Sequence, residues 1–186
     1  MRLFVALDLS DAVRAKIAKF CEMLRAEFPS VRWTRIEGIH VTLKFIGEVP
    51  EESVARIEDA LSAVRSDAPV EMNFRGAGFF PDERRPRVFW IRIDATPNLA
   101  EIGAQIETRL EPLGVVREMR EFKPHLTLAR ISESRGIEKL RAALRRNGPA
   151  DFGAVRTNEM YLYRSELGRG GAKYTKLKTF IFAKMP

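Results

Sequence analysis

The chain runs through the order strand, helix, strand, helix twice, and this duplication restricts its fold more than any other feature of the sequence. Apolar runs predict strands at 1–8, 39–46, 87–94 and 125–131. Helical spacing and capping residues predict helices after Ser10, from Glu51, after Thr96-Pro97 and from Gly136. No linker rich in Pro, Gly or Ser separates the halves, so the pattern indicates one α+β domain over 1–186 with two pseudo-symmetric lobes.

Additional strands are expected outside this repeat. They lie near 70–74, at 160–164 and at 174–182. Gly76 and Gly78 predict a turn after the first of them. The run Gly-Arg-Gly-Gly at 168–171 is expected to join the last two strands into a hairpin.

The only two histidines of the chain stand in duplicated tetrapeptides, HVTL at 40–43 and HLTL at 125–128. The interval from Asp8 to the first histidine nearly equals the interval from Asp94 to the second, so the tetrapeptides occupy equivalent points of the two halves. Side chains alternate between the faces of a strand, so each His and its Thr share one face and the aliphatic pair takes the other. The pattern predicts two imidazoles and two hydroxyls around one volume.

These side chains suit chemistry at a phosphate without a metal ion. The ordinary pKa of an imidazole is near 6.5, so either His40 or His125 can act as a neutral base while the other acts as a charged acid. The hydroxyls of Thr42 and Thr127 can donate to phosphate oxygens. Neither histidine has a second His or a carboxylate at i±2 or i+4, so we expect no metal and no cofactor.

The charge, the single cysteine and the lengths of the apolar runs limit which partners and which compartment fit this chain. Lys and Arg number 32 against 25 Asp and Glu, and the net charge of +7 suits a polyanion without selecting nucleic acid. Cys21 is the only cysteine, which excludes an internal disulfide, and its place on an apolar stripe predicts a core residue. No apolar run reaches the roughly 18 residues of a membrane span, so we expect a cytoplasmic protein without a membrane partner. Nothing in the pattern requires more than a monomer.

Several segments resemble one known family, in the right order and along nearly the whole chain. They are MRLFVALD at 1–8, RPRVFW at 85–90 and FKPHLTLAR at 122–130, together with 40–47 and 165–174. The chain is similar to the two-histidine phosphoesterases, and within them to the bacterial and archaeal RNA 2′,3′-cyclic phosphodiesterases, first described as 2′-5′ RNA ligases. The resemblance implies a bilobal fold with a mostly antiparallel sheet and outer helices in each lobe, and with both motifs facing a central groove.

The resemblance also implies an activity, the metal-independent opening of a terminal 2′,3′-cyclic phosphate on RNA to leave a 2′-phosphate. Carried over by motif, His40 is implied as the proton donor to the leaving 3′ oxygen and His125 as the proton acceptor that activates water. Thr42 and Thr127 are implied as the residues that hold the phosphate. Some members of the family also join RNA ends through 2′-5′ linkages, which is the reverse chemistry.

Three further residues are candidate substrate contacts. Arg130 ends the second motif, but strict alternation puts it on the face opposite to His125, so it needs a bulge or a strand end to reach the phosphate. Lys44 shares the face of His40 by parity, although a solvated lysine at a strand end fits the sequence equally well. Tyr174, near the glycine turn, could contact phosphate or stack on a base.

Two other functions stay open on the sequence alone. A non-catalytic RNA-binding module would use the positive charge, although binding does not require two histidines at matched positions. A phosphodiesterase that acts on small cyclic nucleotides would keep the chemistry and change the substrate. Opening of a cyclic phosphate on RNA in the presence of a chelator separates the three functions.

Overall fold

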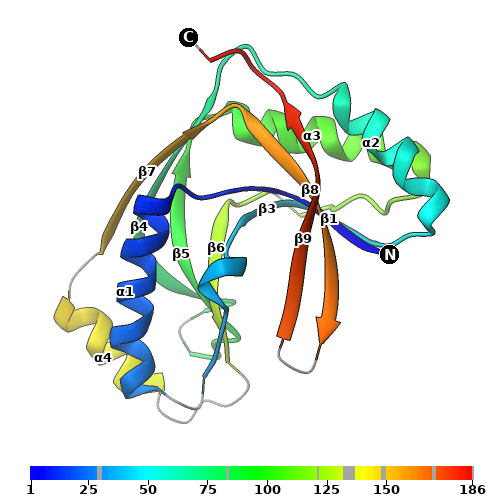
Figure 1. Cartoon of the computed structure of the whole chain (residues 1–186). Coiled ribbons are helices and arrows are strands. Elements are labelled where there is room, and N and C mark those ends of the chain that lie inside the picture. Colours follow the sequence, from blue (N-terminus) through cyan, green and yellow to red (C-terminus); the bar gives the residue numbers. More distant parts are fainter. Residues whose placement is uncertain are drawn as a thin grey trace.

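The structure is a computed structural model that describes residues 1–28, 31–82, 84–120, 122–131, 137–147, 150–168 and 171–185. Two antiparallel sheets and their helices make up the fold (Figure 1). The first sheet has the strand order β3-β1-β8-β9, and the second has the order β2-β6-β5-β4-β7. The predicted α+β architecture with antiparallel sheets is confirmed.

The two sheets do not divide the chain into its two sequence halves. The first sheet contains β1 (Arg2–Leu7), β3 (Val41–Glu48), β8 (Glu159–Gly168) and β9 (Gly171–Ile181). The second contains β2 (Arg32–Trp33), β4 (Val70–Phe80), β5 (Val88–Ala95), β6 (His125–Arg130) and β7 (Asp151–Thr157). The first half thus sends β2 and β4 into the second sheet, and the second half returns β8 and β9 to the first. Each lobe in space therefore contains strands from both halves.

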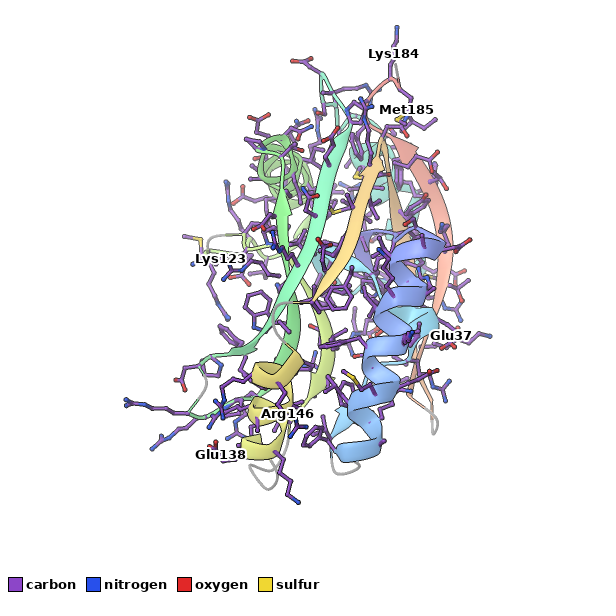
Figure 2. All side chains as sticks on the ribbon, turned by 90° about the vertical axis from the view of Figure 1, so that its left-hand side faces the viewer. Glu37, Lys123, Glu138, Arg146, Lys184 and Met185 are labelled. Atoms are coloured by element: carbon purple, nitrogen blue, oxygen red, sulfur yellow. The ribbon has the colours of Figure 1, made fainter. Side chains whose placement is uncertain are left out.

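The helices lie in two pairs. The first pair is α1 (Asp11–Glu27) and α4 (Ile137–Asn147), which contact each other, with α1 also against β7. The second pair is α2 (Val54–Ser62) and α3 (Asn98–Leu110), with α2 against β9 and α3 against β3. Figure 2 shows α1 and α4 side by side, with Glu138 and Arg146 marking α4. Three short 3-10 turns complete the described elements: η1 (Ile36–Gly38), η2 (Glu51–Ser53) and η3 (Glu111–Leu113).

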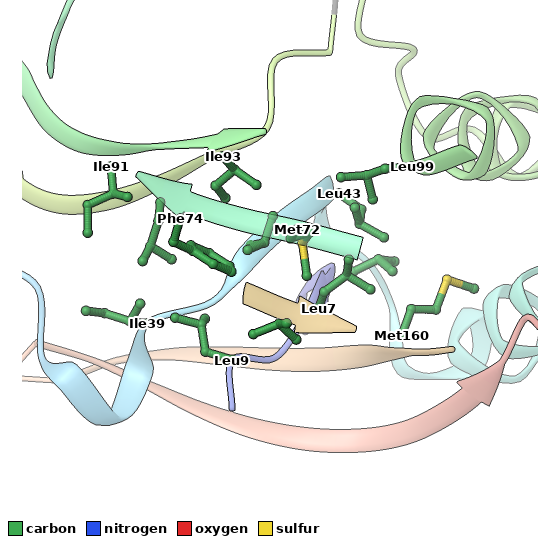
Figure 3. Close-up of a cluster of buried hydrophobic side chains, with 14 of the residues drawn as sticks. Leu7, Leu9, Ile39, Leu43, Met72, Phe74, Ile91, Ile93, Leu99 and Met160 are labelled. Atoms are coloured by element: carbon green, nitrogen blue, oxygen red, sulfur yellow. The ribbon is translucent and has the colours of Figure 1, made fainter. Parts of the chain in front are cut away.

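The apolar side chains of both sheets and of the helices form one core. Leu7 and Leu43 of the first sheet lie beside Met72 and Phe74 of the second (Figure 3). Cys21 is buried in this core, as expected, and burial raises the pKa of its thiol to about 11, so the thiol stays protonated. Across the described ranges, no helix is long and apolar enough to cross a membrane.

The structure differs from the sequence prediction at β4. The expected turn at Gly76 and Gly78 is absent, because β4 runs unbroken to Phe80. Gly76 has a φ of +73° at a bulge against β5, so the glycine bends the strand and does not reverse it. The sequence also does not predict β2, which has only two residues, or β7. The expected helix start at Gly136 lies outside the described residues.

The two motif strands meet where the sheets adjoin. β3 is the edge strand of the first sheet. β2 pairs with β6 at Ala129 and Arg130, and the Thr34 N–H donates to the Leu128 carbonyl, so the stretch of β6 from His125 to Thr127 is also an edge. β3 and β6 contact each other. We call this contact the seam, and it joins two strands that are far apart in the sequence, β3 directly after His40 and β6 beginning at His125.

Candidate functional site

Both histidines are held through the same nitrogen. His40 Nδ1 lies 2.7 Å from the carbonyl oxygen of Gly38, and His125 Nδ1 lies 2.8 Å from the carbonyl oxygen of Lys123. A carbonyl oxygen only accepts hydrogen bonds, so each Nδ1 carries the hydrogen and donates it. Nε2 of each imidazole is thereby left for a reaction, as an acceptor when the ring is neutral and as a donor when it is charged.

In each motif the His–Thr pair lies on the face opposite to the aliphatic pair. The aliphatic residues of the motifs are buried in the common core: Val41, Leu43, Leu126 and Leu128. His40, Thr42 and Thr127 are half-buried, and His125 is exposed. The alternation predicted from the sequence therefore holds across each tetrapeptide.

Each motif strand carries a bulge at the leucine that ends its tetrapeptide. The pairing of β3 with β1 skips Leu43, and the pairing of β6 with β5 skips Leu128. The residue after each of these leucines is buried and the next one is exposed. In β6 that exposed residue is Arg130, which the bulge returns to the face of Thr127. A bulge is the condition that the sequence analysis set for Arg130 to reach the phosphate.

Lys44 does not lie on this face, and the sequence predictions for it need correction. Its Nζ is buried 2.6 Å from Oε2 of Glu107 on α3, and it donates to the carbonyl oxygen of Val116 at 2.7 Å. The parity argument stops at Leu43, because the bulge interrupts the alternation there. Lys44 ties β3 to α3 and to the chain that leads into the second motif, so it is neither a solvated lysine nor placed as a substrate contact.

Aromatic rings surround His40. Phe4 of β1 stacks on the imidazole with ring centroids 4.5 Å apart, and Tyr163 of β8 stacks on Phe4 at 5.2 Å. Tyr174 of β9 meets the imidazole edge-on at 5.1 Å. A Cβ on Gly38 would lie 3.0 Å from the Tyr174 ring, so the glycine lets this ring close against the turn that holds His40. The structure thus brings Tyr174 to the first motif.

The surroundings of His40 act on its pKa in opposite directions. Burial lowers the pKa below the ordinary value of 6.5 and outweighs the Gly38 carbonyl and the Asp8 carboxylate, which both raise it. Arg14 also lowers the pKa. Its guanidinium donates to two carbonyl oxygens of the 36–39 turn, at 2.7 and 3.2 Å, and so fixes the segment that carries the histidine.

Asp8 joins a network that is not predictable from the sequence, where this residue only marks a point of the repeat. Its carboxylate accepts a hydrogen bond from the Tyr163 hydroxyl and forms an ion pair with Lys176 at 2.9 Å. Burial and the bond to Asp8 raise the pKa of Tyr163, so the phenol stays protonated. No local signal links these residues, because β1 lies at the opposite end of the chain from β8 and β9.

His125 has different neighbours. Trp90 of β5 meets its imidazole edge-on, with ring centroids 6.2 Å apart. By their spacing to the motif histidines in the sequence, Asp8 and Asp94 are equivalent residues of the two halves. Counted from each motif threonine, the β1–β3 and β5–β6 registers instead make Arg92 the counterpart of Asp8. A carboxylate therefore accompanies the first histidine, and a guanidinium accompanies the second.

The sequence and the fold match known proteins. A family model described as LigT like Phosphoesterase matches residues 7–90 and again residues 91–174. Proteins named RNA 2′,3′-cyclic phosphodiesterase are 31% identical in Methanothermobacter thermautotrophicus and 34% identical in Archaeoglobus fulgidus, over 97% of this chain and 98% and 99% of the relatives. The crystal structure of TT0787 of Thermus thermophilus has a TM-score of 0.81 at 29% identity over 98% of both chains. E. coli LigT complexed with 3′-AMP has a TM-score of 0.78 at 27% identity over 97% of both chains.

These matches cover both motifs and nearly every element of the fold. The family model spans most of the chain, and the two named relatives match the chain along almost their whole length. The chain therefore belongs to the LigT-like phosphoesterases, the two-histidine family that its paired tetrapeptides resemble.

Proposed function

We propose that the protein hydrolyses the 2′,3′-cyclic phosphate at the end of an RNA to a 2′-phosphate, without a metal ion or a cofactor. The observation that carries the proposal is the matched pair of imidazoles, one directly before β3 and one at the start of β6, each held through Nδ1 by a backbone carbonyl, on strands that contact each other. The relatives named RNA 2′,3′-cyclic phosphodiesterase support the same activity and an RNA substrate.

In this reaction His125 is the base and His40 is the acid. Nε2 of His125 takes a proton from water as the water oxygen bonds to phosphorus. The bond between phosphorus and the 3′ oxygen breaks, and Nε2 of His40 gives its proton to that oxygen. Each transfer contributes about 10²–10⁴-fold to the rate. The reaction leaves His125 charged and His40 neutral. His125 then releases its proton to solvent and His40 takes one up, which restores the starting pair.

The exposure of His125 and the charges near His40 support this assignment. His125 is exposed, so water reaches it directly. Burial disfavours the charged form of His40 that an acid needs, but a bound phosphodiester carries a negative charge that favours this form. Asp8 acts in the same direction as the phosphate.

The other polar side chains of the seam bind the substrate. Thr42 and Thr127 donate their hydroxyl hydrogens to the non-bridging phosphate oxygens, and Arg130 neutralises the charge that grows on them in the transition state. Tyr174 orients His40 and offers its ring to the substrate. We also propose that the chain works as one monomeric domain over 1–186 with two pseudo-repeats, because one chain supplies both histidines. The cytoplasmic location stays a prediction.

The direct test is to incubate the protein and a chelator with an RNA oligonucleotide that ends in a 2′,3′-cyclic phosphate. The product is expected to match a 2′-phosphate standard, and not a 3′-phosphate standard, on chromatography. Absence of opening, or equal opening by His40→Ala and His125→Ala variants, would contradict the proposal. Binding of the RNA without opening would indicate the non-catalytic module instead. Opening of cyclic mononucleotides alone would indicate a small-nucleotide phosphodiesterase.

A further inference from the structure

An arginine that belongs to neither motif lies beside the second histidine. In the pairing of β5 with β6, Arg92 is directly opposite His125, and Trp90 is directly opposite Thr127. Directly opposed residues of an antiparallel pair share a face, with Cβ atoms about 4.5–5.5 Å apart. Arg92 therefore lies on the face that carries the second His–Thr pair, and it is exposed.

The guanidinium of Arg92 forms no ion pair with any carboxylate in the described part of the chain. On the same sheet, the exposed Arg156 pairs with Glu71 at 3.5 Å. Asp94 lies on the same face of β5 as Arg92, two residues further on, yet the two do not pair. An arginine without an anionic partner next to a phosphate site is available to bind an anion from the substrate.

Arg92 and Arg130 lie at opposite ends of the second motif. His125 is the first residue of β6 and Arg130 is the last, with one bulged residue between them. At about 3.3 Å per residue, the two arginines are roughly 13 Å apart along the strand. Thr127 lies between them. The two guanidinium groups thus bracket the reacting phosphate, which indicates a substrate with a second anionic group.

An RNA end has such a second group. It carries the terminal cyclic phosphate and, one nucleotide away, the phosphodiester that joins the last two nucleotides, whereas a cyclic mononucleotide carries only the first. We propose that Arg92 binds this second phosphodiester and so makes the protein select RNA ends over free cyclic nucleotides. The inference rests on the proposed function, because it takes the reacting phosphate to lie between the two histidines.

The test compares kcat/KM on 2′,3′-cyclic AMP and on an adenosine dinucleotide that ends in a 2′,3′-cyclic phosphate. We expect Arg92→Gln to lower the ratio of dinucleotide to mononucleotide roughly tenfold or more, and Arg92→Lys, which keeps the charge, to lower it less. Arg109→Gln removes the same charge from an exposed site on α3 and should keep the wild-type ratio. If Arg92→Gln retains the wild-type ratio, whether both rates fall or neither does, the proposal is overturned.

A binding measurement separates this inference from the proposed function. Fluorescence anisotropy competition in the His40→Ala background compares a dinucleotide ending in a 2′-phosphate with adenosine 2′-phosphate. Arg92→Gln should abolish most of the preference for the dinucleotide, and it should flatten the dependence of that preference on salt. If the wild-type protein opens neither cyclic substrate, the proposed function fails while this preference still decides the role of Arg92. If the His40→Ala protein shows the same preference for the dinucleotide with and without Arg92→Gln, the inference is overturned.

Discussion

The two histidines share a motif but not an environment. Each belongs to the same tetrapeptide pattern, points away from the core, donates from Nδ1 to a carbonyl two residues back, and precedes a bulge. His40, however, is half-buried against Phe4 with the carboxylate of Asp8 nearby. His125 is exposed, and the guanidinium-bearing Arg92 lies opposite it.

This difference shows which level of structure supplies which property of the site. The tetrapeptide and its strand set the position and the orientation of each imidazole. Neighbours from other strands set the hydration and the charge around it, through Asp8 of the chain after β1 and Arg92 of β5. A pair of identical motifs can therefore hold one acid and one base.

The histidines themselves give the largest effect. Replacing either His40 or His125 by alanine should lower the single-turnover rate of cyclic phosphate opening about 10²–10⁴-fold, because each removes one proton transfer. The double variant should lose little more than the worse single variant, since the two act as a unit. Circular dichroism of each variant checks the fold. A variant that keeps most of its rate would show that one histidine suffices, and it would contradict the division into one acid and one base.

The residue that follows the bulged leucine differs between the two motifs. It is Lys44 in the first motif and Ala129 in the second. Lys44→Met leaves the half-buried Glu107 carboxylate without its cation, and the free energy of unfolding should fall by up to about 3–5 kcal/mol, the cost of breaking a buried pair. Urea titration measures the change. Lys178→Met breaks the more exposed pair with Glu58 and should cost less than about 1 kcal/mol. Equal losses in the two variants would contradict an interior role for Lys44.

Replacing either of two glycines perturbs the surroundings of one histidine only, Gly38 for His40 and Gly78 for His125. Gly38→Ala puts a Cβ 3.0 Å from the Tyr174 ring and should displace either this ring or the turn that holds His40, lowering kcat roughly 10- to 100-fold. Gly78→Ala puts a Cβ 3.3 Å from the Trp90 ring, a milder contact, and should lower kcat less. Steady-state kinetics on one oligonucleotide compares them. A larger loss in Gly78→Ala would place the more demanding packing at the second motif.

The smallest expected effect concerns protonation. The Asp8 carboxylate raises the pKa of His40, so Asp8→Asn should lower that pKa further and move one limb of the pH profile of kcat/KM toward acid. If His40 is the acid, kcat/KM at pH 7 falls, by about tenfold for each unit of the shift. Asp94→Asn, on β5, is the matched control and should leave the profile in place. A limb that moves toward alkali in Asp8→Asn would contradict the effect of this carboxylate.

Local features of the site were predictable because they depend on short stretches of chain. Ser10 begins α1 by accepting a hydrogen bond from the backbone nitrogen of Val13, as a capping residue should. The alternation within each tetrapeptide placed each His–Thr pair on the face opposite to its buried aliphatic pair. The same argument failed at Lys44, because an ordinary leucine occupies the bulge and nothing in its type marks it.

Strand periodicity and a duplicated motif are local and countable properties, so the amino-acid order alone predicts two histidines with partner threonines at equivalent points of an α+β fold. The differences between the two sites depend on tertiary structure. The bulge that redirects Arg130, the carboxylate of Asp8 near the first histidine and Arg92 opposite the second all depend on strand register. Register joins residues that are distant in the sequence, and the packing of the whole core sets it, so no single segment of the chain encodes it.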